Sequence, residues 1–428
     1  MSFSRYPTYK DSGVEWLGQV PGHWAVKRLK QACHVFPSNV DKKSHDGETP
    51  VLLCNYTDVY YNETITAGME FMAATASTDQ IAKFTLRAGD TIITKDSETA
   101  DDIAIAAYVP ADLPGVICGY HLSMVRPLPD ADGAFIKRFF DSNFAKSCFA
   151  VLANGLTRVG LGQYALDNVE LAFPPLAEQT QIAAFLDRET AKIDALVAEQ
   201  RRLMALLKEK RQAVISHAVT RGLNFDAPLK PSCITGIEYV PAHWDVMVIK
   251  RFSTLHRGHD LTDSERTEGP YPVVTSSGIN GTHGSFMAHG PGVVTGRYGS
   301  TGRLFYIQDD FWPHNTSLYV SNFHGNHPRF VWYSLQTVDF AAHSAKAAVP
   351  GIDRNDIHVL PVAVPPKEEQ VAIVTFLDSE LTKLDLLTTE NQRAIHLLQE
   401  RRTALISAAV TGQIDVRGVV TQAELESV

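Results

Sequence analysis

The sequence predicts an α+β protein in which two α/β domains of a shared fold are separated by two long helices that pair as an antiparallel coiled coil. Two internal repeats predict this fold class. Residues 160–220 reappear at 351–411 with an offset of 191, and 25 of the 50 aligned positions from Leu171 onward are identical. A shorter motif at 20–26 returns at 240–246 with an offset of 220. The chain is therefore expected to be a pseudo-twofold molecule with two equivalent ends.

The change of offset between the two repeats places the domain borders. The second variable block is shorter than the first, while the motifs on either side of it are kept. A chain of 428 residues also exceeds the ~250–300 residues at which a single core stops growing. We therefore expect a first domain over 1–155, a helical spacer over 156–223, a second domain over 224–350 and a second helical spacer over 351–428.

The two variable blocks, at about 24–155 and 244–350, are expected to be rich in strands. Short β-branched and aromatic runs alternate with Gly and Asn clusters, as in 272–275 and 292–295. The blocks also resemble each other faintly, since 89–95 lines up with 290–296 and 121–125 lines up with 316–320. We therefore predict one shared α/β fold whose loops have diverged.

Long helices are expected at about 175–217 and 366–408. A Pro-Pro pair precedes each of them, which suits a helix start because the missing N–H has no intrahelical partner there. Gly222 and Gly412 follow, and glycine commonly ends helices. Neither Gly nor Pro interrupts the stretches between. A helix of ~40 residues is about 60 Å long.

A heptad pattern predicts that these helices form a coiled coil. In the first helix one seam position holds Ile182, Leu196 and Leu203, and the other holds Leu186, Ile193, Leu207 and Val214. The alternative is that each helix packs on a globular core. Gln200 and Asn391 occupy the same core position, and antiparallel pairing would bring them close together as a polar pair that fixes register. Alternatively, these side chains extend to solvent or face a third helix.

Composition limits the possible functions. The net charge of −9, from 39 basic and 48 acidic side chains, argues against a basic coat for nucleic acid. A DNA-binding role would need local basic groups or help from partners. The five cysteines are scattered and form no CxxC motif, so we expect reduced thiols of a cytoplasmic protein. No apolar run approaches the ~18 residues that suggest a membrane span, and the N-terminal residues do not resemble a signal peptide.

The repeated motifs resemble those of one family, the specificity subunits of type I restriction–modification enzymes. A VPxHW opening, a variable block, a PPLxEQxxIxxFLD stretch and an LLKEKR stretch follow each other twice over nearly the whole length. The residues that carry the resemblance, with their counterparts 191 positions on, are Pro174, Pro175, Glu178, Gln179, Phe185, Leu186, Asp187, Asp194, Lys210 and Arg211. The second copy departs at 367–368, where Lys-Glu replaces Leu-Ala.

The resemblance implies a division of labour. Each variable block would be a target-recognition domain that reads one half of a bipartite, non-palindromic site in double-stranded DNA. The helices would fix the half-site spacing and bind two modification subunits, with Gln200, Asn391, Phe185 and Phe376 as candidate spacer and partner residues. The chain itself would be non-catalytic and without a cofactor. S-adenosylmethionine is expected on the modification subunits, and ATP and Mg²⁺ on restriction (motor-nuclease) subunits of the full complex.

Candidate DNA-contacting residues lie in Gly-rich or basic loops of the variable blocks, because glycine lets the backbone approach phosphates and arginine can bind guanine. In the first block they are Lys42, Lys43, Asn55, Tyr56, Lys95 and Ser97. In the second they are Ser276, Asn280, Arg297, Tyr298, Ser300 and Arg303. The alternative for each is a plain solvated turn.

Motifs for catalysis are missing from the sequence. A Gly-rich cofactor loop, an Asn/Asp-Pro-Pro-aromatic motif and a phosphate-binding GxxxxGK[ST] loop are all absent. His256 and His259, or His283 and His289, lack further ligands at a recognisable spacing. We therefore predict no catalytic and no metal-binding residues. Two alternatives remain, a self-contained modification enzyme and a coiled-coil adaptor that binds only proteins.

Overall fold

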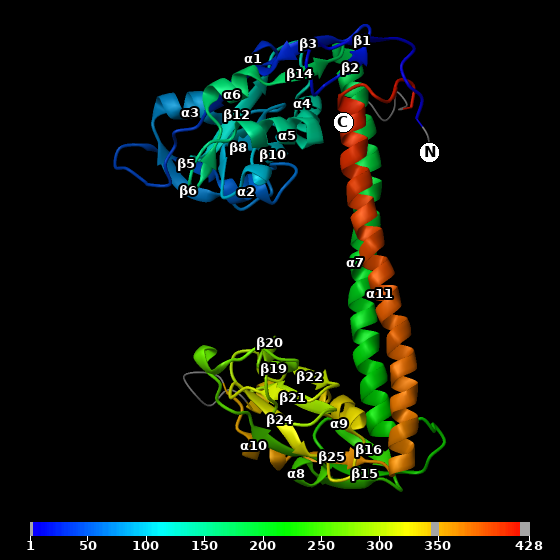
Figure 1. The fold of residues 1–428 in the computed structure, drawn as a ribbon. Helices are drawn as coiled ribbons and strands as arrows, with labels where there is room; N and C mark the ends of the chain where they lie inside the picture. The colour runs from blue at the N-terminus through cyan, green and yellow to red at the C-terminus, as the bar shows by residue number, and fades with distance from the viewer. Residues whose placement is uncertain (1–2, 344–350, 420–428) are drawn as a thin grey trace. The chain divides into compact units, whose positions relative to one another are not determined.

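The computed structural model describes residues 3–343 and 351–419, and the chain divides into two units. Unit 1 comprises residues 1–200 and 393–428, and unit 2 comprises residues 201–392. Each unit holds one variable block together with one half of each long helix. Figure 1 shows the blocks as mixed layers of strands and short helices, and the two long helices running side by side.

The first block is built around two four-stranded sheets. One sheet has the order β10-β8-β12-β4, and the other has the order β6-β5-β11-β7. Their strands are β4 (Cys33–Pro37), β8 (Thr91–Thr94), β10 (Ala106–Tyr108), β12 (Leu122–Pro127), β5 (Thr49–Cys54), β6 (Met72–Ala76), β7 (Thr85–Leu86) and β11 (Leu113–Cys118). The helices of this block are α1 (Leu29–Ala32), α2 (Tyr56–Tyr60), α3 (Thr78–Phe84), α4 (Gly133–Asp141), α5 (Asn143–Leu152) and α6 (Gln163–Asn168). Smaller pairs join β1 (Tyr9–Asp11) to β2 (Gln19–Pro21), β3 (Ala25–Arg28) to β14 (Glu170–Phe173), and β9 (Asp96–Ser97) to β13 (Val159–Gly160).

The second block repeats this plan in a reduced form. A four-stranded sheet has the order β18-β24-β21-β22, and a three-stranded sheet has the order β20-β19-β23. Their strands are β18 (Thr254–Arg257), β21 (Gly292–Gly296), β22 (Leu304–Ile307), β24 (Ser317–Asn322), β19 (Tyr271–Thr275), β20 (Gly278–His283) and β23 (Trp312–Pro313). The helices are α8 (Ile249–Phe252), α9 (Pro328–Leu335) and α10 (Arg354–His358). The border pairs are β15 (Leu229–Ile234) with β16 (Ile237–Pro241), and β17 (Asp245–Val248) with β25 (Pro361–Val364).

The register of the central strands confirms the shared fold and corrects one sequence alignment. Thr94 pairs with Leu122 in the first block, and Gly296 pairs with Ser317 in the second. The two sequence alignments therefore cannot both hold. The Lys95 carbonyl accepts the N–H of Leu161, and the Arg297 carbonyl accepts that of Ile352, 191 positions on. The alignment of 121–125 with 316–320 therefore fits, and that of 89–95 with 290–296 is wrong by one residue. Short β-branched runs fit a strand in either register, and only the hydrogen-bonded neighbour decides between them.

Both long helices confirm the prediction from sequence. They are α7 (Leu176–Arg221) and α11 (Lys367–Val410), which begin directly after the Pro-Pro pairs. Gly222 and Gly412 follow them with φ of +75° and +73°, a conformation that costs L-residues energy but not glycine.

Within each unit the two helices are antiparallel. In unit 1 the Arg402 guanidinium lies 3.0 Å from the Asp194 carboxylate. In unit 2 Arg211 forms the repeat-related ion pair with Asp385. A residue late in one helix meets a residue early in the other in both cases, which only antiparallel pairing allows.

The buried seam agrees with one predicted heptad position and contradicts the other. Leu186, Ile193 and Leu207 are buried as expected. At the other predicted position Ile182 is fully buried, whereas Leu196 and Leu203 are 51% and 44% exposed. The second seam position instead runs through residues 190, 197, 204 and 211, and through residues 381, 388, 395 and 402 in the repeat. Sequence periodicity missed this position because Thr190 and Arg211 in α7, and Thr388 and Arg402 in α11, interrupt its apolar pattern, while leucines lie beside it.

The end of the described chain packs beside its beginning in unit 1. The backbone N–H of Asp415 donates to the Ser4 carbonyl at 2.8 Å, and the Tyr9 hydroxyl donates to the Gly412 carbonyl at 3.0 Å. The Arg417 guanidinium lies 4.9 Å from the centre of the Tyr6 ring. Thus two segments far apart in sequence together form the border of the first block.

Candidate functional site

The VPxHW motif meets the start of helix α7 in unit 1. The Glu178 carboxylate is buried there and accepts hydrogen bonds from the Tyr6 hydroxyl at 2.5 Å and from His23 Nε2 at 2.8 Å. Burial and the neighbouring Glu178 carboxylate raise the pKa of Tyr6, so its hydroxyl remains a donor. Gly412, at the end of α11, closes this junction, because a Cβ at Gly412 would lie 2.3 Å from Pro21 Cδ and 3.0 Å from the Trp24 ring.

The same junction recurs in unit 2 with the repeat-related residues. The Glu369 carboxylate accepts hydrogen bonds from His243 Nε2 at 2.8 Å and from Trp244 Nε1 at 3.0 Å. Gly222, at the end of α7, packs here on Glu369 and Trp244. Each VPxHW motif therefore joins the start of one long helix to the end of the other.

The glutamine that follows each of these glutamates fastens the block to its helix. Gln179 accepts the backbone N–H of Asp132, ahead of α4, at 2.8 Å and donates to the Pro174 carbonyl at 2.9 Å. Gln370 accepts the N–H of His327, ahead of α9, at 2.9 Å and donates to the Pro365 carbonyl at 3.0 Å. Both glutamines are buried. The repeated Glu-Gln pair thus sets the position of each block on its own helix start.

A network of charges further binds the first block to the helices. Glu63, in the loop after α2, accepts hydrogen bonds from Lys137 Nζ and from Arg402 Nη2, both at 2.5 Å. Arg402 also bonds Asp194, and Arg138 bonds Asp187 at 2.6 Å. Burial raises the pKa of Glu63, but the charges of Lys137, Arg402 and Arg138 outweigh burial and lower it to about 2.

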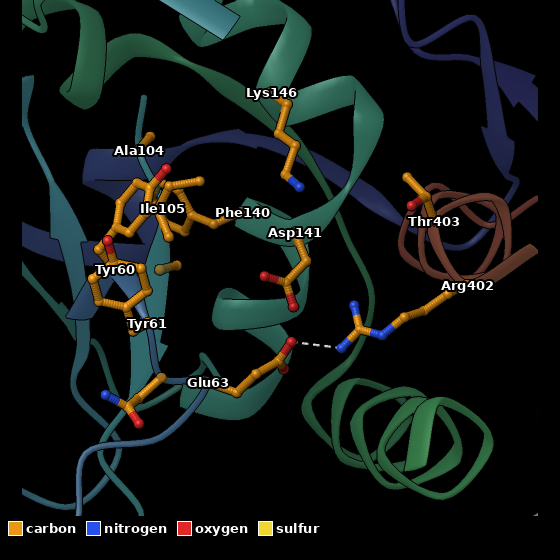
Figure 2. A pocket seen from close by; sticks show the side chains of 12 residues that line it. Tyr60, Tyr61, Glu63, Ala104, Ile105, Phe140, Asp141, Lys146, Arg402 and Thr403 are labelled. Atoms are coloured by element: carbon orange, nitrogen blue, oxygen red, sulfur yellow. Dashed lines mark hydrogen bonds and ion pairs between the residues drawn. The ribbon is translucent and has the colours of Figure 1, made fainter. Parts of the chain in front are cut away.

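A cavity of about 260 Å³ lies beside this network, between the first block and α11. Figure 2 shows Glu63 and Arg402 joined by their ion pair in the lining of this cavity, with Asp141 and Lys146 on the α4–α5 side. Tyr60 and Tyr61 line the cavity from α2 and its end. Sequence reasoning missed Glu63, because it lies outside every repeat and its partners are more than 70 residues away.

The second block meets its helix differently. Tyr333 of α9 occupies the place that Arg138 has on α4, and its hydroxyl donates to Asp378 at 2.5 Å. Arg329 bonds the same carboxylate at 2.8 Å. Arg211, the counterpart of Arg402, bonds Asp385. A carboxylate from the second block does not reach Arg211 in the described part of unit 2. The two blocks therefore share the Gln anchor but differ in charged contacts.

In the first block, the structure brings several of the predicted DNA-contacting residues together. Tyr56 lies against Ser97 and beneath the Arg158 guanidinium, which is 5.8 Å from the ring centre. The Lys95 ammonium lies 4.5 Å from the centre of the Tyr120 ring. Asn55 caps α2, and the side chain of Ser97 is buried. Lys42 and Lys43 lie apart, exposed on the loop after Val40.

Three of the predicted residues of the second block, Ser276, Arg297 and Tyr298, meet at Thr316. The backbone N–H of Ser276 donates to the Thr316 hydroxyl at 3.3 Å, and that of Arg297 donates to the Thr316 carbonyl at 2.9 Å. Tyr298 follows Arg297, and Ser300 accepts the N–H of Arg303 at 3.4 Å. Asn280 is exposed on β20, and its carbonyl accepts a bond from Arg266 at 3.0 Å. A basic and aromatic surface thus forms at one end of β21.

The four candidate spacer residues have different environments. Phe185 is fully buried and packs edge-on against Phe3, whereas Phe376 is 40% exposed. Asn391 is buried and Gln200 is half-buried. The expected proximity of Gln200 and Asn391 stays a prediction.

Leucines form an exposed pair on the helices of each unit. Unit 1 exposes Leu196 of α7 and Leu397 of α11, and unit 2 exposes the repeat-related Leu387 of α11 and Leu206 of α7. Each unit therefore exposes the same two repeat-related leucine positions on its helices.

No cluster of three or more His, Cys, Asp or Glu side chains that could hold a metal is found in the described residues. All five cysteines are free thiols, and burial raises the pKa of Cys33, Cys54 and Cys118. A helix long and apolar enough to cross a bilayer is likewise not found among these residues.

Comparisons with known proteins place these features in one family. A family model described as "Type I restriction modification DNA specificity domain" matches residues 21–203 and, a second time, residues 241–395. The EcoKI specificity subunit of Escherichia coli K12 is 31% identical over 105 residues, which are 24% of this chain and 22% of that protein. The putative MjaX specificity subunit of Methanocaldococcus jannaschii is 21% identical over 235 residues, 54% of this chain and 53% of that protein. The chain thus spans about half or less of the length of these curated relatives.

Solved structures show the same fold. A chain from a study of "complex assembly and conformational transition of the type I R-M system" matches with a TM-score of 0.74 at 15% identity, over 94% of this chain and 99% of that chain. The HsdS subunit of Thermoanaerobacter tengcongensis matches with a TM-score of 0.53 at 16% identity, over 92% and 98%. With the specificity domain found in both halves of the sequence and this fold in both matching structures, the chain belongs to the type I restriction–modification specificity family.

Proposed function

We propose that this chain is the sequence-specific DNA-recognition subunit of a type I restriction–modification enzyme. Each block would read one half of a bipartite, non-palindromic site, and the helices would set the spacing of the half-sites. The observation that carries the proposal is the double match of the specificity domain onto two blocks of one fold with different loops. The shared Gln anchor and the different loops suit two readers of different sequence.

The chain would act in the cytoplasm without catalytic groups of its own. Two modification subunits would bring S-adenosylmethionine and methylate adenine, and restriction subunits would bring ATP and Mg²⁺ for cleavage. The net negative charge of the chain supports this division, because phosphate contacts from partners would supply much of the DNA affinity.

The exposed leucines support the proposal that each unit binds one modification subunit. Leu196 with Leu397, and Leu387 with Leu206, offer the same apolar surface twice, as two identical partners would require. Changing Leu206 and Leu397 to Ala should weaken binding of a modification subunit by roughly tenfold or more for each side chain. Lys208→Ala, on the same exposed helix, is the control. Calorimetric titration measures the affinity of each variant for the modification subunit. If the leucine variants bind it as tightly as the Lys208→Ala control, the docking surface lies elsewhere.

Methylation mapping tests the DNA-reading proposal. The chain is expressed with its modification subunits, and N6-methyladenine is located across the host genome. We expect one bipartite motif with two unlike halves. Replacing residues 24–155 by the equivalent block of another family member should change one half and leave the other half and the gap intact. A lone chain that methylates DNA when given only S-adenosylmethionine would contradict the proposal.

A further inference from the structure

We propose that Lys95 with Tyr120, and Arg297 with Tyr298, are structurally equivalent DNA contacts, one in each half-site. The inference rests on the proposed DNA-reading function and names residues that carry it. Both basic residues directly follow the central strand of the four-stranded sheet, β8 in the first block and β21 in the second.

Backbone hydrogen bonds establish the equivalence. The N–H of Lys95 donates to the His121 carbonyl at 3.1 Å, and that of Arg297 donates to the Thr316 carbonyl at 2.9 Å. On the other side, the Lys95 carbonyl accepts the N–H of Leu161 at 2.8 Å. The Arg297 carbonyl accepts the N–H of Ile352 at 2.9 Å, and Ile352 lies 191 positions after Leu161. The two cations therefore hold the same place in the shared frame.

Both cations lie over an exposed tyrosine at the same distance. Lys95 Nζ is 4.5 Å from the centre of the Tyr120 ring, and Arg297 Cζ is 4.5 Å from the centre of the Tyr298 ring. The tyrosines are 48% and 38% exposed. They come from different places, since Tyr120 precedes β12 and Tyr298 follows Arg297. The same cation–aromatic arrangement is thus reached by two routes, as expected of a feature that serves a function.

Neither cation is neutralised by a carboxylate in the described residues. Asp96, next to Lys95, instead bonds His121 Nδ1 at 2.5 Å and Arg158 at 2.6 Å. In a chain of net charge −9, an uncompensated cation at the same point of both blocks is suited to a polyanion. A ring face holds the cation by cation–π attraction without neutralising it. The Lys95 ammonium donates one long hydrogen bond, of 3.5 Å, to the Ser38 carbonyl, which carries no net charge.

The chemistry fits contacts to either the bases or the phosphates of duplex DNA. A guanidinium can donate two parallel bonds to guanine O6 and N7, whereas an ammonium acts as a compact point charge. Because one block carries Lys and the other Arg, on tyrosines of different origin, equivalent positions would favour different half-site sequences. This agrees with a non-palindromic site.

The test uses the complete complex of this chain with its modification subunits and a library of duplexes randomised in both half-sites. Methylated products are sequenced. We expect Lys95→Met and Tyr120→Ala to alter only the first half-site, and Arg297→Met and Tyr298→Ala to alter only the second. Methionine keeps the apolar contact with the ring and removes the charge. Preference for the favoured base should fall roughly 5- to 150-fold where a base is read.

The Arg297→Lys variant distinguishes a contact with a guanine base from a contact with a phosphate. If Arg297 reads guanine, the lysine variant should lose preference as fully as the methionine variant. If it binds phosphate, the lysine variant should be nearly normal. The methionine variant should then weaken binding evenly across sequences and reduce the salt dependence by about one counterion. Both results support a DNA contact at this position.

Two variants serve as controls. Lys83→Ala removes an exposed lysine that lies 5.2 Å from the Phe84 ring on α3, away from the strand end. Arg251→Ala removes an exposed arginine of α8. The inference is overturned if the wild-type complex methylates a bipartite site and the Lys95 and Arg297 variants, assembled normally by gel filtration, behave like these controls. A wild-type complex without a bipartite site would refute the proposed function itself.

Discussion

At the residue scale, the glycines that end the long helices are tightly constrained. Gly412 combines a φ of +73° with a position where a Cβ would collide with Pro21 and Trp24. Gly418, in the same terminal segment, has a φ of +74°, and a Cβ added there would meet no other atom within 4 Å. Substitutions at Gly412 and Gly418 would therefore strain the backbone to the same extent, and only the substitution at Gly412 would add a steric clash.

We predict that Gly412→Ala destabilises unit 1 more than Gly418→Ala does. The conformational cost is of order 1–3 kcal/mol for both, and only Gly412 adds the clash with the VPxHW motif. Thermal unfolding of the two variants beside the wild type measures the difference. If both variants unfolded at the same temperature, the junction around Gly412 would accommodate the added methyl group without loss of stability.

Glu63 should make the first block sensitive to acid. Its folded pKa of about 2 is lower than the ordinary value of 4.5. The ionised carboxylate therefore contributes stability that is complete above pH about 4.5 and is lost as the pH falls towards 2. Denaturant unfolding between pH 7 and pH 2.5 should show a steeper acid loss for wild type than for Glu63→Gln. Glu70→Gln, which changes a carboxylate of the same block outside this network, should follow the wild type.

At the scale of elements, the paired helices show what a sequence pattern can and cannot predict. Helix bounds followed from the Pro-Pro starts, the glycine ends and the uninterrupted stretch between them. One seam position followed from Leu186 and Ile193. The other did not, because Leu196 and Leu203 repeat with the same spacing, while Thr190 and Arg211 interrupt the apolar pattern of the position that faces the partner helix. Hydrophobic periodicity alone cannot distinguish a helix–helix seam from an exposed apolar strip beside it.

We therefore predict very different effects for two neighbouring apolar residues of α7. Ile193→Ala removes a side chain that is 5% exposed and should cost about 2–5 kcal/mol of unfolding free energy. Leu196→Ala removes one that is 51% exposed and should change stability by less than about 0.5 kcal/mol. Chemical denaturation measures both. If Leu196→Ala also lowered the unfolding free energy by several kcal/mol, the seam predicted from the sequence would be correct.

At the scale of the whole molecule, the repeats predicted two blocks of one fold and the family to which the chain belongs. Strand order and register could not be predicted from the sequence, because β12 pairs with β8 and β4 through hydrogen bonds between residues distant in sequence. The same limit explains the one-residue error at Lys95. It also explains why Glu63 was missed, since its contacts with Lys137 and Arg402 exist only once the block is folded onto the helices.

The described segments around Ser4 and Asp415 meet in unit 1, so the border of this unit is formed without an unbroken backbone between them. Unit 2 forms the same border from one unbroken stretch, residues 222–241. A circularly permuted chain, with Val419 joined to Phe3 by a short flexible linker and new ends opened at the exposed turn beside Phe225, should fold and read the same bipartite site. Opening the chain at Gln200 within α7 should abolish assembly. A border built once from two segments and once from a single stretch would then depend on their packing and not on an unbroken backbone.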